Sequence, residues 1–542
     1  MNADLNVAIT PVPIKVYANT FPCPEKAKNR SKAIFSLGMK DRAVYNERMR
    51  NILLLLLALL SQAEMAPALT AEARYTHGVF YRDMQRQPVM QLKITGEPGE
   101  KITSITFTPG ETSKPGDIKM VRLSSRDDWN GYTFNTTKYI HENAKGKFSK
   151  GKITFKHEYT LGSSPLYIWL SYDLAAGAVR NGKIDAVCTA INTEDGETTE
   201  PEVILADALE ERKIGRVYRF PYRIVPYYRP RWVKGWGNAE KAVHLTPTHF
   251  NLFTDLIHFA YSVTAEGNID YQWAGGGQSN KEVADEALEE IKRLHKEAKS
   301  KAKLIAGFAH MDGPMTTAVA NPTTRRTMAR NMATWAIERG YDGIDIDWEY
   351  PDSDEQWKNL GHFIADLREE LSGSGISISI AASVGYKVPN YWTTDQLDFI
   401  MTMSYDDLTP DNHASMRLFQ RDADICQNKF HMPKQKIVLG LPFYSNEQGK
   451  LTAQYGYSSV YNWNPRMKPD VNNCRLKNQD GTEGPMHTFN GPNLIAQKCR
   501  WAKENKMGGV MIWAYETDLP IKHKASLSRA MFKVLRQPKK KQ

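Results

Sequence analysis

The feature that most constrains the fold is an alternation of short apolar segments with amphipathic segments over about 223–535. Apolar runs of strand length recur eight times, and helix-period segments lie between several of them. The expected strands are 224–228, 256–261, 304–308, 343–349, 376–382, 399–405, 436–441 and 510–513. The expected helices are 281–299, 323–339, 355–371, 494–506 and 525–535. Eight β/α units predict an α/β TIM (β/α)8 barrel over 220–537. A doubly wound open sheet is the alternative, although no glycine-rich loop follows the first strand.

The region 74–215 has a different pattern. Alternating apolar and polar residues at 89–94, 101–107, 152–156 and 166–170 predict short strands, and Pro-Gly pairs separate several of them. Almost no helical period is present. We therefore expect an antiparallel β-sandwich domain ahead of the barrel.

The start of the chain predicts export. Met49 and Arg50 precede an unbroken apolar run over 52–60, and small residues follow it, as in a secretory signal peptide over 49–73. The run is too short to span a bilayer comfortably. A buried core helix is the alternative for the apolar run. We interpret 1–48 as a mis-annotated upstream extension, with an unusually long basic region of the signal peptide as the alternative. We therefore expect a secreted or periplasmic protein, with association at the cell surface as an alternative. We expect no stable insertion into a membrane.

The net charge of +10 does not describe the expected folded body. Residues 1–48 and the Lys-rich tail 533–542 carry most of it, and 49–532 sum to +1. Binding to nucleic acid therefore loses its main support. Cys474 and Cys499 could pair, but their spacing does not establish it. We find no cluster with metal-ligand spacing, and expect no metal, no cofactor and a monomer.

The expected fourth strand carries a row of acids. Asp345, Asp347 and Glu349 alternate with apolar residues, so the three carboxyls share one face of the strand. Acids this close repel each other, which raises the pKa of at least one member and can keep a general acid protonated. A solvated or salt-bridged edge strand and a divalent-cation site are the alternatives.

The segment from Asp342 to Glu349 resembles the DxxDxDxE signature of family 18 glycoside hydrolases, which are chitinases and endo-β-N-acetylglucosaminidases built on TIM barrels. The segments 403–406, 436–444 and 508–513 are similar to the family's motifs at strands six, seven and eight. The resemblance covers about 223–535.

The resemblance implies a role for each acid. Glu349 would be the general acid that protonates the glycosidic oxygen. Asp347 would orient the substrate's N-acetyl group and stabilise the oxazolinium ion that it forms, and Asp345 would tune Asp347. Asp342 and Gly343 would support the strand. The implied reaction is retaining and substrate-assisted, and it requires a sugar with a 2-acetamido group, such as N-acetylglucosamine (GlcNAc).

The resemblance also implies residues that hold the sugar. Tyr405 would hydrogen-bond the N-acetyl carbonyl, and the indole of Trp513 would form the floor under the reacting sugar. The expected substrate-binding residues are Trp513, Met403, Asp406, Tyr444 and Tyr261.

Three features depart from the pattern or extend it. On the third strand the family's SxGG is replaced, with Gly307 at the position of the serine and His310 at that of a glycine. Only 445–490 is available for the insertion after strand seven, which predicts a shallow cleft and endo action. Its aromatic residues are candidate sugar contacts, namely Trp463, Tyr455, Tyr457 and Tyr461. In the front domain, 166–174 and 185–190 resemble the module ahead of Bacteroidetes-type sialidases.

The resulting hypothesis is a secreted hydrolase of β-1,4-linked GlcNAc, in chitin or chitooligosaccharides. An endo-β-N-acetylglucosaminidase that releases N-glycans from glycoproteins is the alternative within the family. A catalytically silent carbohydrate-binding lectin on the same barrel is the alternative of another class. The retained Glu349 favours the enzyme.

Overall fold

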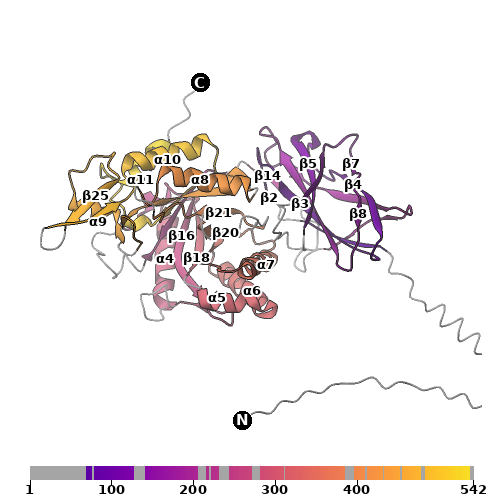
Figure 1. Ribbon diagram of the computed structural model, residues 1–542, viewed down its shortest axis with the longest axis horizontal. Helices are drawn as coiled ribbons and strands as arrows, with labels where there is room; N and C mark the ends of the chain where they lie inside the picture. The colour runs from indigo at the N-terminus through magenta and orange to yellow at the C-terminus, as the bar shows by residue number, and fades with distance from the viewer. Residues whose placement is uncertain are drawn as a thin grey trace, which may run out of the picture. The chain divides into compact units, whose positions relative to one another are not determined.

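The computed structural model describes residues 69–75, 79–126, 141–204, 215–218, 221–230, 243–271, 281–309, 312–384, 396–408, 412–430, 432–451, 454–477 and 482–536. The upstream segment, nearly all of the predicted signal peptide, His310 and the end of the Lys-rich tail lie outside these residues. Figure 1 gives the arrangement of the elements.

Eight parallel strands form a closed barrel, as predicted. They are β15 (Arg223–Tyr228), β16 (Asp255–Val263), β18 (Lys303–Ala309), β19 (Gly343–Asp347), β20 (Ser377–Ala382), β21 (Phe399–Thr402), β22 (Ile437–Pro442) and β27 (Gly509–Trp513). Each strand pairs with the next strand in this series. The first strand, β15, pairs with both the second, β16, and the last, β27, which closes the ring. This closure confirms the TIM barrel and excludes the open sheet.

The strand pleat divides the apolar residues into two layers. On β19, Ile344 and Ile346 pack outward against the helices, while Asp345 and Asp347 alternate with them. A separate small core inside the barrel contains Tyr227, Phe259 and the partly buried Trp513. The period-2 argument for one carboxylate face therefore holds in the structure.

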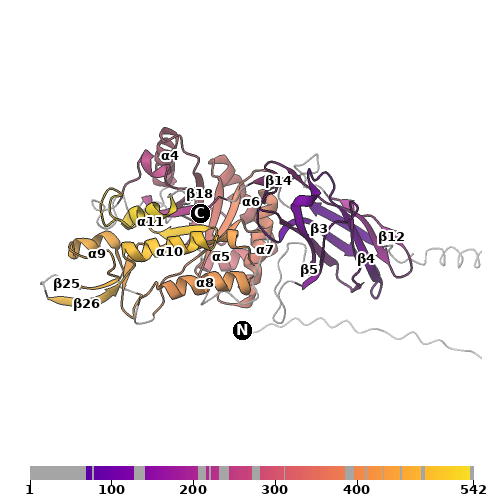
Figure 2. The ribbon, with the colours of Figure 1, turned by 90° about the horizontal axis from the view of Figure 1, so that it is seen from above.

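Helices surround the strands (Figure 2). They are α3 (Pro247–Phe250), α4 (Lys281–Glu297), α5 (Asp312–Ala320), α6 (Pro322–Glu338), α7 (Asp354–Glu370), α8 (Met416–Asn428), α10 (Pro492–Glu504) and α11 (Leu527–Leu535). The five expected helices are all present, within a few residues. Side-chain caps fix several starts: the Asn321 side chain accepts from two backbone N–H groups of α6, and Ser353 and Ser526 cap α7 and α11.

A small α+β insertion follows the seventh strand. Its four-stranded antiparallel sheet has the order β24-β23-β26-β25, from β23 (Tyr444–Glu447), β24 (Gln454–Gly456), β25 (Asn473–Lys477) and β26 (Glu483–Thr488), and it carries α9 (Tyr457–Trp463). A short strand, β17 (Ile269–Asp270), pairs with the end of β16.

The front region consists of β-sheets, as predicted. A six-stranded sheet has the order β13 (Glu202–Val203), β1 (Thr70–Tyr75), β3 (Gln87–Thr95), β9 (Leu166–Leu174), β5 (Ile118–Arg126) and β6 (His141–Gly146). A second sheet contains β12 (Thr198–Thr199), β11 (Val187–Thr193), β4 (Lys101–Thr108), β7 (Ile153–Phe155) and β8 (Tyr159–Thr160). A third joins β10 (Lys183–Ile184), β14 (Gly215–Tyr218) and β2 (Val79–Tyr81). These sheets enclose a hydrophobic core of their own.

Strand pairing extends this region beyond 74–215 at both ends. The strand β1 begins at Thr70, with Ala71 and Ala73 buried, and β14 runs to Tyr218. All four described cysteines are free, so the pairing of Cys474 with Cys499 does not occur in the structure.

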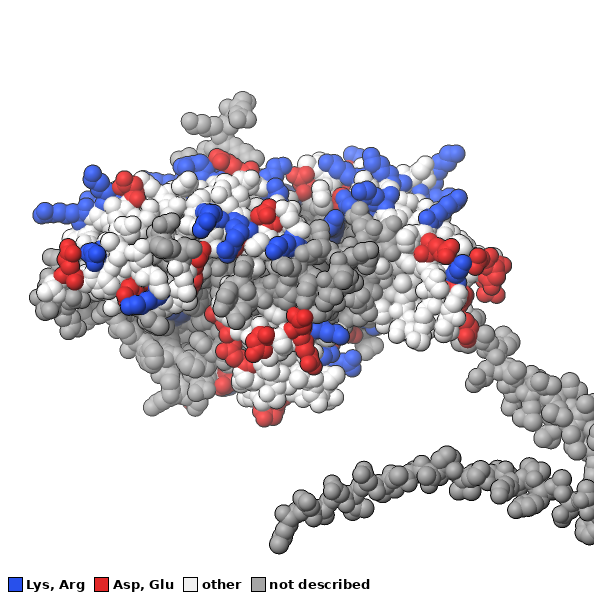
Figure 3. All heavy atoms as spheres, viewed as in Figure 1, with Lys and Arg blue, Asp and Glu red and all other residues white. Residues whose placement is uncertain are grey.

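Charge on the barrel is mixed, with Lys, Arg, Asp and Glu interspersed over the face that Figure 3 shows. The front region has a denser basic cluster on β6, β7 and the segments beside them, where five lysines between Lys145 and Lys156 are exposed. Because β6 and β7 are edge strands, these charges hinder edge-to-edge pairing with other chains. In the described part of the chain no helix has the length and apolarity needed to cross a bilayer.

The position of β1 makes a prediction about export. Cleavage after Ala73 would remove four of the six residues of β1, whereas cleavage after Ala68 leaves the strand intact. We therefore expect the exported protein to begin at Leu69, as read by N-terminal sequencing. An exported protein that begins at Arg74 would contradict this prediction.

Candidate active site

Three carboxylates lie in a row from the barrel interior to its mouth. Asp345 is fully buried and Asp347 is 3% exposed, whereas Glu349 lies just beyond the end of β19 and reaches solvent. The three carboxyls thus share one face, as predicted, and their exposure to solvent increases from Asp345 to Glu349.

Asp345 is held by two hydroxyls. Tyr227 Oη donates to Asp345 Oδ2 at 2.6 Å, and Ser379 Oγ donates to Oδ1 at 2.6 Å. Burial raises the pKa of Asp345 to about 6, although both hydrogen bonds oppose the shift because they stabilise the ionised form. Asp345 is therefore the member of the row that can be ionised near neutral pH.

Asp347 has the opposite environment. Its Oδ1 atom is buried and has no hydrogen-bond partner among the described residues. Burial, and then the nearby charges of Glu349 and Asp345, hold the pKa of Asp347 well above its usual range. The protonated form of Asp347 is therefore favoured, and one of its oxygens is buried without a hydrogen-bond partner among the described residues.

Glu349 occupies the accessible end of the row. Protein surrounds it closely enough that desolvation raises its pKa, while a hydrogen bond with Tyr350 acts in the opposite direction. The charges of Asp406 and Asp312 add to the rise. A carboxyl that reaches solvent and keeps its proton toward neutral pH is suited to general acid chemistry.

Asp406 follows β21 and has a left-handed backbone conformation with φ of 63°. Its Oδ1 accepts from Tyr444 Oη at 2.5 Å and from Asn446 Nδ2 at 2.6 Å, and His413 Nδ1 lies 3.3 Å away. The start of the insertion therefore fixes this acid at the mouth of the barrel.

Tyr405 and Met403 follow β21. Tyr405 is half-buried, and its ring contacts that of Tyr444 edge-on at 5.9 Å. The ring fits because residue 440 on the next strand is glycine: a Cβ there would lie 2.9 Å from the Tyr405 ring. Met403 is buried beside it, at 8% exposure.

Trp513 ends the eighth strand. Its indole contacts Tyr227 at 5.3 Å and Phe259 at 4.9 Å, both edge-on, and the guanidinium of Arg229 lies 5.2 Å from the ring centre. Arg229 is in turn paired with the buried carboxylate of Glu516. These contacts hold the indole at the end of the barrel core, where one part stays accessible.

The expected sugar contact at Tyr261 is wrong. Tyr261 is fully buried between the sheet and the helices, where its hydroxyl contacts Tyr341 at 2.8 Å. An irregularity in the pairing of β16 between Phe259 and Tyr261 reverses the alternation, so Phe259 faces the barrel interior and Tyr261 faces outward.

The two support residues have the contacts expected of them. Asp342 Oδ2 accepts from the backbone N–H of Leu304 at 2.9 Å, which ties the start of β19 to β18. At Gly343 a Cβ would lie 2.6 Å from Ser377 Oγ and 3.0 Å from Ile305, so no larger residue fits without movement.

The sequence did not reveal several residues of the site. Tyr227, Ser379, Asn446, Tyr350 and Arg229 all contact the row, Asp406 or Trp513, and none lies in a motif that was assigned a role. Counting inward positions on the first and fifth strands would have found Tyr227 and Ser379. Among the described residues no group of three or more His, Cys, Asp or Glu side chains could hold a metal ion.

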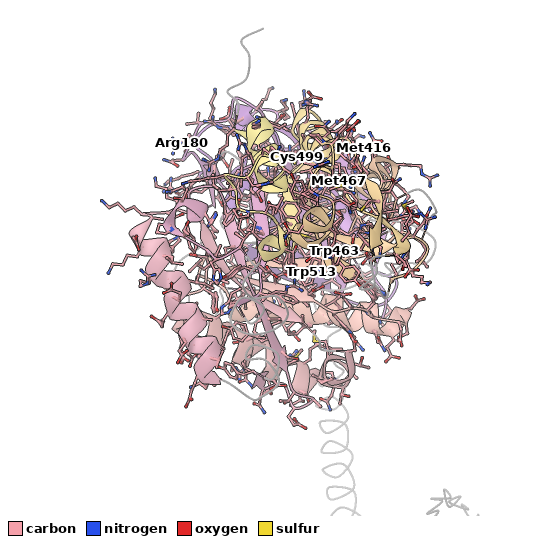
Figure 4. All side chains as sticks on the ribbon, turned by 90° about the vertical axis from the view of Figure 1, so that its left-hand side faces the viewer. Arg180, Met416, Trp463, Met467, Cys499 and Trp513 are labelled. Carbon is pink, nitrogen blue, oxygen red and sulfur yellow. The ribbon has the colours of Figure 1, made fainter. Side chains whose placement is uncertain are left out.

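The insertion adds two exposed aromatic side chains. Tyr455 and Trp463 are 42% and 41% exposed and meet edge-on at 4.9 Å, whereas Tyr457 and Tyr461 are buried. Trp463 and Trp513 lie near each other in the projection of Figure 4. Of the four insertion aromatics, only the exposed pair is accessible to a ligand.

The barrel region is similar to known proteins. The family model described as "Glycosyl hydrolases family 18" matches residues 223–518. "Chitinase 1" of Aphanocladium album is 27% identical over 318 residues, which are 48% of this chain and 75% of that protein. "Endochitinase 1" of Metarhizium robertsii is 25% identical over 37% of this chain and 58% of that protein. A chitinase structure from Bacteroides thetaiotaomicron covers 58% of this chain and 98% of its own, with 23% identity and a TM-score of 0.47.

The raised pKa of Asp347 predicts an unusual pH dependence of stability. Because the folded-state pKa lies above the unfolded value, the fold loses stability as pH rises through the folded pKa. Asn cannot ionise. As pH rises from about 5 to about 9, the Tm of Asp347→Asn, measured by thermal unfolding, should therefore fall less than the Tm of the native protein. The exposed Asp352→Asn is the matched control and should follow the native curve. An equal loss of Tm in Asp347→Asn and the native protein would contradict the assignment.

Proposed function

Because this chain belongs to family 18 of the glycosyl hydrolases and is a chitinase-like glycoside hydrolase, we propose that it cleaves the β-1,4 bonds of chitin or chitooligosaccharides. The proposed mechanism is retaining and substrate-assisted. The observation that carries it is the graded row of carboxyls, in which a solvent-accessible Glu349 follows the buried Asp347 and Asp345. The chitinases among the similar proteins support the choice of substrate.

In the first step Glu349 gives its proton to the glycosidic oxygen, and the bond from C1 to that oxygen breaks. The carbonyl oxygen of the substrate's own acetamido group forms a bond to C1, which gives an oxazolinium ion. A water then attacks C1 while the Glu349 carboxylate takes its proton, and the bond from C1 to the acetamido oxygen breaks, which restores the acetamido group. The two successive displacements at C1 retain its configuration. No second carboxylate acts as a nucleophile.

Asp347 and Asp345 stabilise the intermediate in this scheme. The unpartnered Oδ1 of Asp347 is available to the acetamido N–H, a role that suits a buried oxygen without a protein donor. As positive charge develops on the acetamido group, negative charge on Asp347 and Asp345 becomes favourable in the dry interior. The proton of Asp347 can pass to Asp345, whose pKa is about 6.

The surrounding residues supply the sugar site. We assign Trp513 to the apolar face of the reacting sugar, and Tyr405 and Asp406 to its acetamido group, with Met403 packed beside them. Tyr444 acts on Asp406 through its hydroxyl. Support comes from the fixed orientation of Trp513 over Tyr227 and Phe259.

The general acid predicts a large and specific loss of rate. Glu349→Gln keeps the shape of the side chain but holds no transferable proton, so hydrolysis of chitopentaose should fall by ~10²–10⁴ with binding retained. Product chromatography and calorimetry measure the two quantities. Glu355→Gln, an exposed change on α7, is the control and should keep the native rate. Native hydrolysis by Glu349→Gln would mean that another residue is the acid.

Substrate assistance predicts which sugars are cleaved. The chain should hydrolyse chitopentaose but not its fully de-N-acetylated counterpart, because an amino group cannot form the oxazolinium ion. Comparable rates on both would contradict the mechanism. A high-mannose glycopeptide tests the alternative of an N-glycan endo-β-N-acetylglucosaminidase. Binding of these ligands with cleavage of none would instead favour a lectin.

A further inference from the structure

The deepest carboxyl of the row accepts hydrogen bonds from two other strands, the adjacent β20 and β15. Asp345 accepts one hydroxyl on each oxygen, from Tyr227 of β15 and from Ser379 of β20. Ser379 is 1% exposed and lies directly opposite Asp345 in the register of β19 with β20. Both oxygens of Asp345 therefore have a short hydrogen bond in a space without solvent.

The strand on the other side of Asp345 contributes no donor. Its register partner on β18 is Gly307. A Cβ at this glycine would lie 2.8 Å from Ile257 Cγ2 and 3.2 Å from the ring of Phe259, so apolar atoms fill the place that a side chain would take. Of the two strands that flank β19, only β20 can supply a hydroxyl to this carboxyl.

We propose that Ser379 is a positioning residue for the reaction, which acts through Asp345 and keeps that carboxyl in its ionised, accepting form; the proposal rests on the proposed function. It makes the fifth strand part of the machinery, although no motif of the resemblance includes it. It also supplies a hydroxyl on the side of β19 opposite Gly307, the glycine at the position of the family's serine.

The physical effect follows from what a hydroxyl donor does to an acid. A hydrogen bond to a carboxylate stabilises the ionised form, so the Ser379 hydroxyl lowers the pKa of Asp345 against the effect of burial. Burial, the charge of Glu349 and then the charge of an ionised Asp345 raise the pKa of Asp347. Ser379 therefore helps decide which of the two buried acids carries the proton.

Few other groups can produce this effect. Among the described residues, the titratable groups that interact with Asp345 are Tyr227 of β15 and Asp347 of its own strand. The flanking strands present Gly307 and Ser379, which do not titrate at these pH values. Arg223 and Asp255 form an ion pair at 2.6 Å, and each is the first residue of its strand, β15 and β16. The two charges of this pair cancel.

The test is the pH profile of kcat/KM for chitopentaose. Ser379→Ala should move the acid limb upward by about one pH unit, because a hydrogen bond to a charged acceptor contributes an effect of that order. It should lower kcat more than it changes KM. Tyr227→Phe removes the other donor and should move the limb in the same direction. Ser377→Ala is the matched control on β20, since its hydroxyl donates to the backbone oxygen of Asp342 at 3.2 Å; its limb should not move.

A second measurement does not depend on turnover. The absent donor raises the folded-state pKa of Asp345 further, so the Tm deficit of Ser379→Ala against the native protein should grow from about pH 5 to pH 8. The deficit of Ser377→Ala should stay constant over the same range. An unmoved acid limb, or a Tm deficit independent of pH, would overturn the proposal. If native protein cleaves no chitooligosaccharide, the proposed function fails, and the Tm profiles alone decide the role of Ser379.

Discussion

The structure depends on the burial of several carboxyls on one strand of a closed barrel. Asp345 and Asp347 lie in a space that excludes water, and each would be costly there as an uncompensated charge. The two acids have different environments. Two hydroxyls donate to Asp345, while burial raises the pKa of Asp347, which has one oxygen without a hydrogen-bond partner among the described residues. The difference between the two environments, rather than the acids alone, makes the row chemically useful.

The architecture could be predicted from the sequence because both layers of the barrel follow short-range periodicity. All eight expected strands are present, and the alternation at 343–347 places the acids correctly. The error at Tyr261 shows the limit of that reasoning. A pairing irregularity in β16 reverses the alternation, and nothing in the local pattern of 255–263 reveals it.

The contacts that affect the ionisation of the acids could not be predicted in this way, since they depend on how separate strands are brought together. Tyr227 and Ser379 are ordinary residues in their own segments. The pairing of β20 with β19 brings Ser379 to Asp345, and the barrel brings Tyr227 to it. Similarly, Asn446 and Tyr444 reach Asp406 because the insertion begins where the seventh strand ends. Motifs therefore located the row of acids, but not the groups whose contacts affect the ionisation of these acids.

The closure of the barrel by β15 has a consequence for how activity relates to folding. The bond from Tyr227 to Asp345 joins residues 118 positions apart, and it exists only when the first strand is in place between the second and the eighth. The acidity of Asp345 is thus a cooperative property of the complete ring. In a partly folded chain all three acids of the row would be present, but the protonation states of these acids would differ from those in the complete barrel.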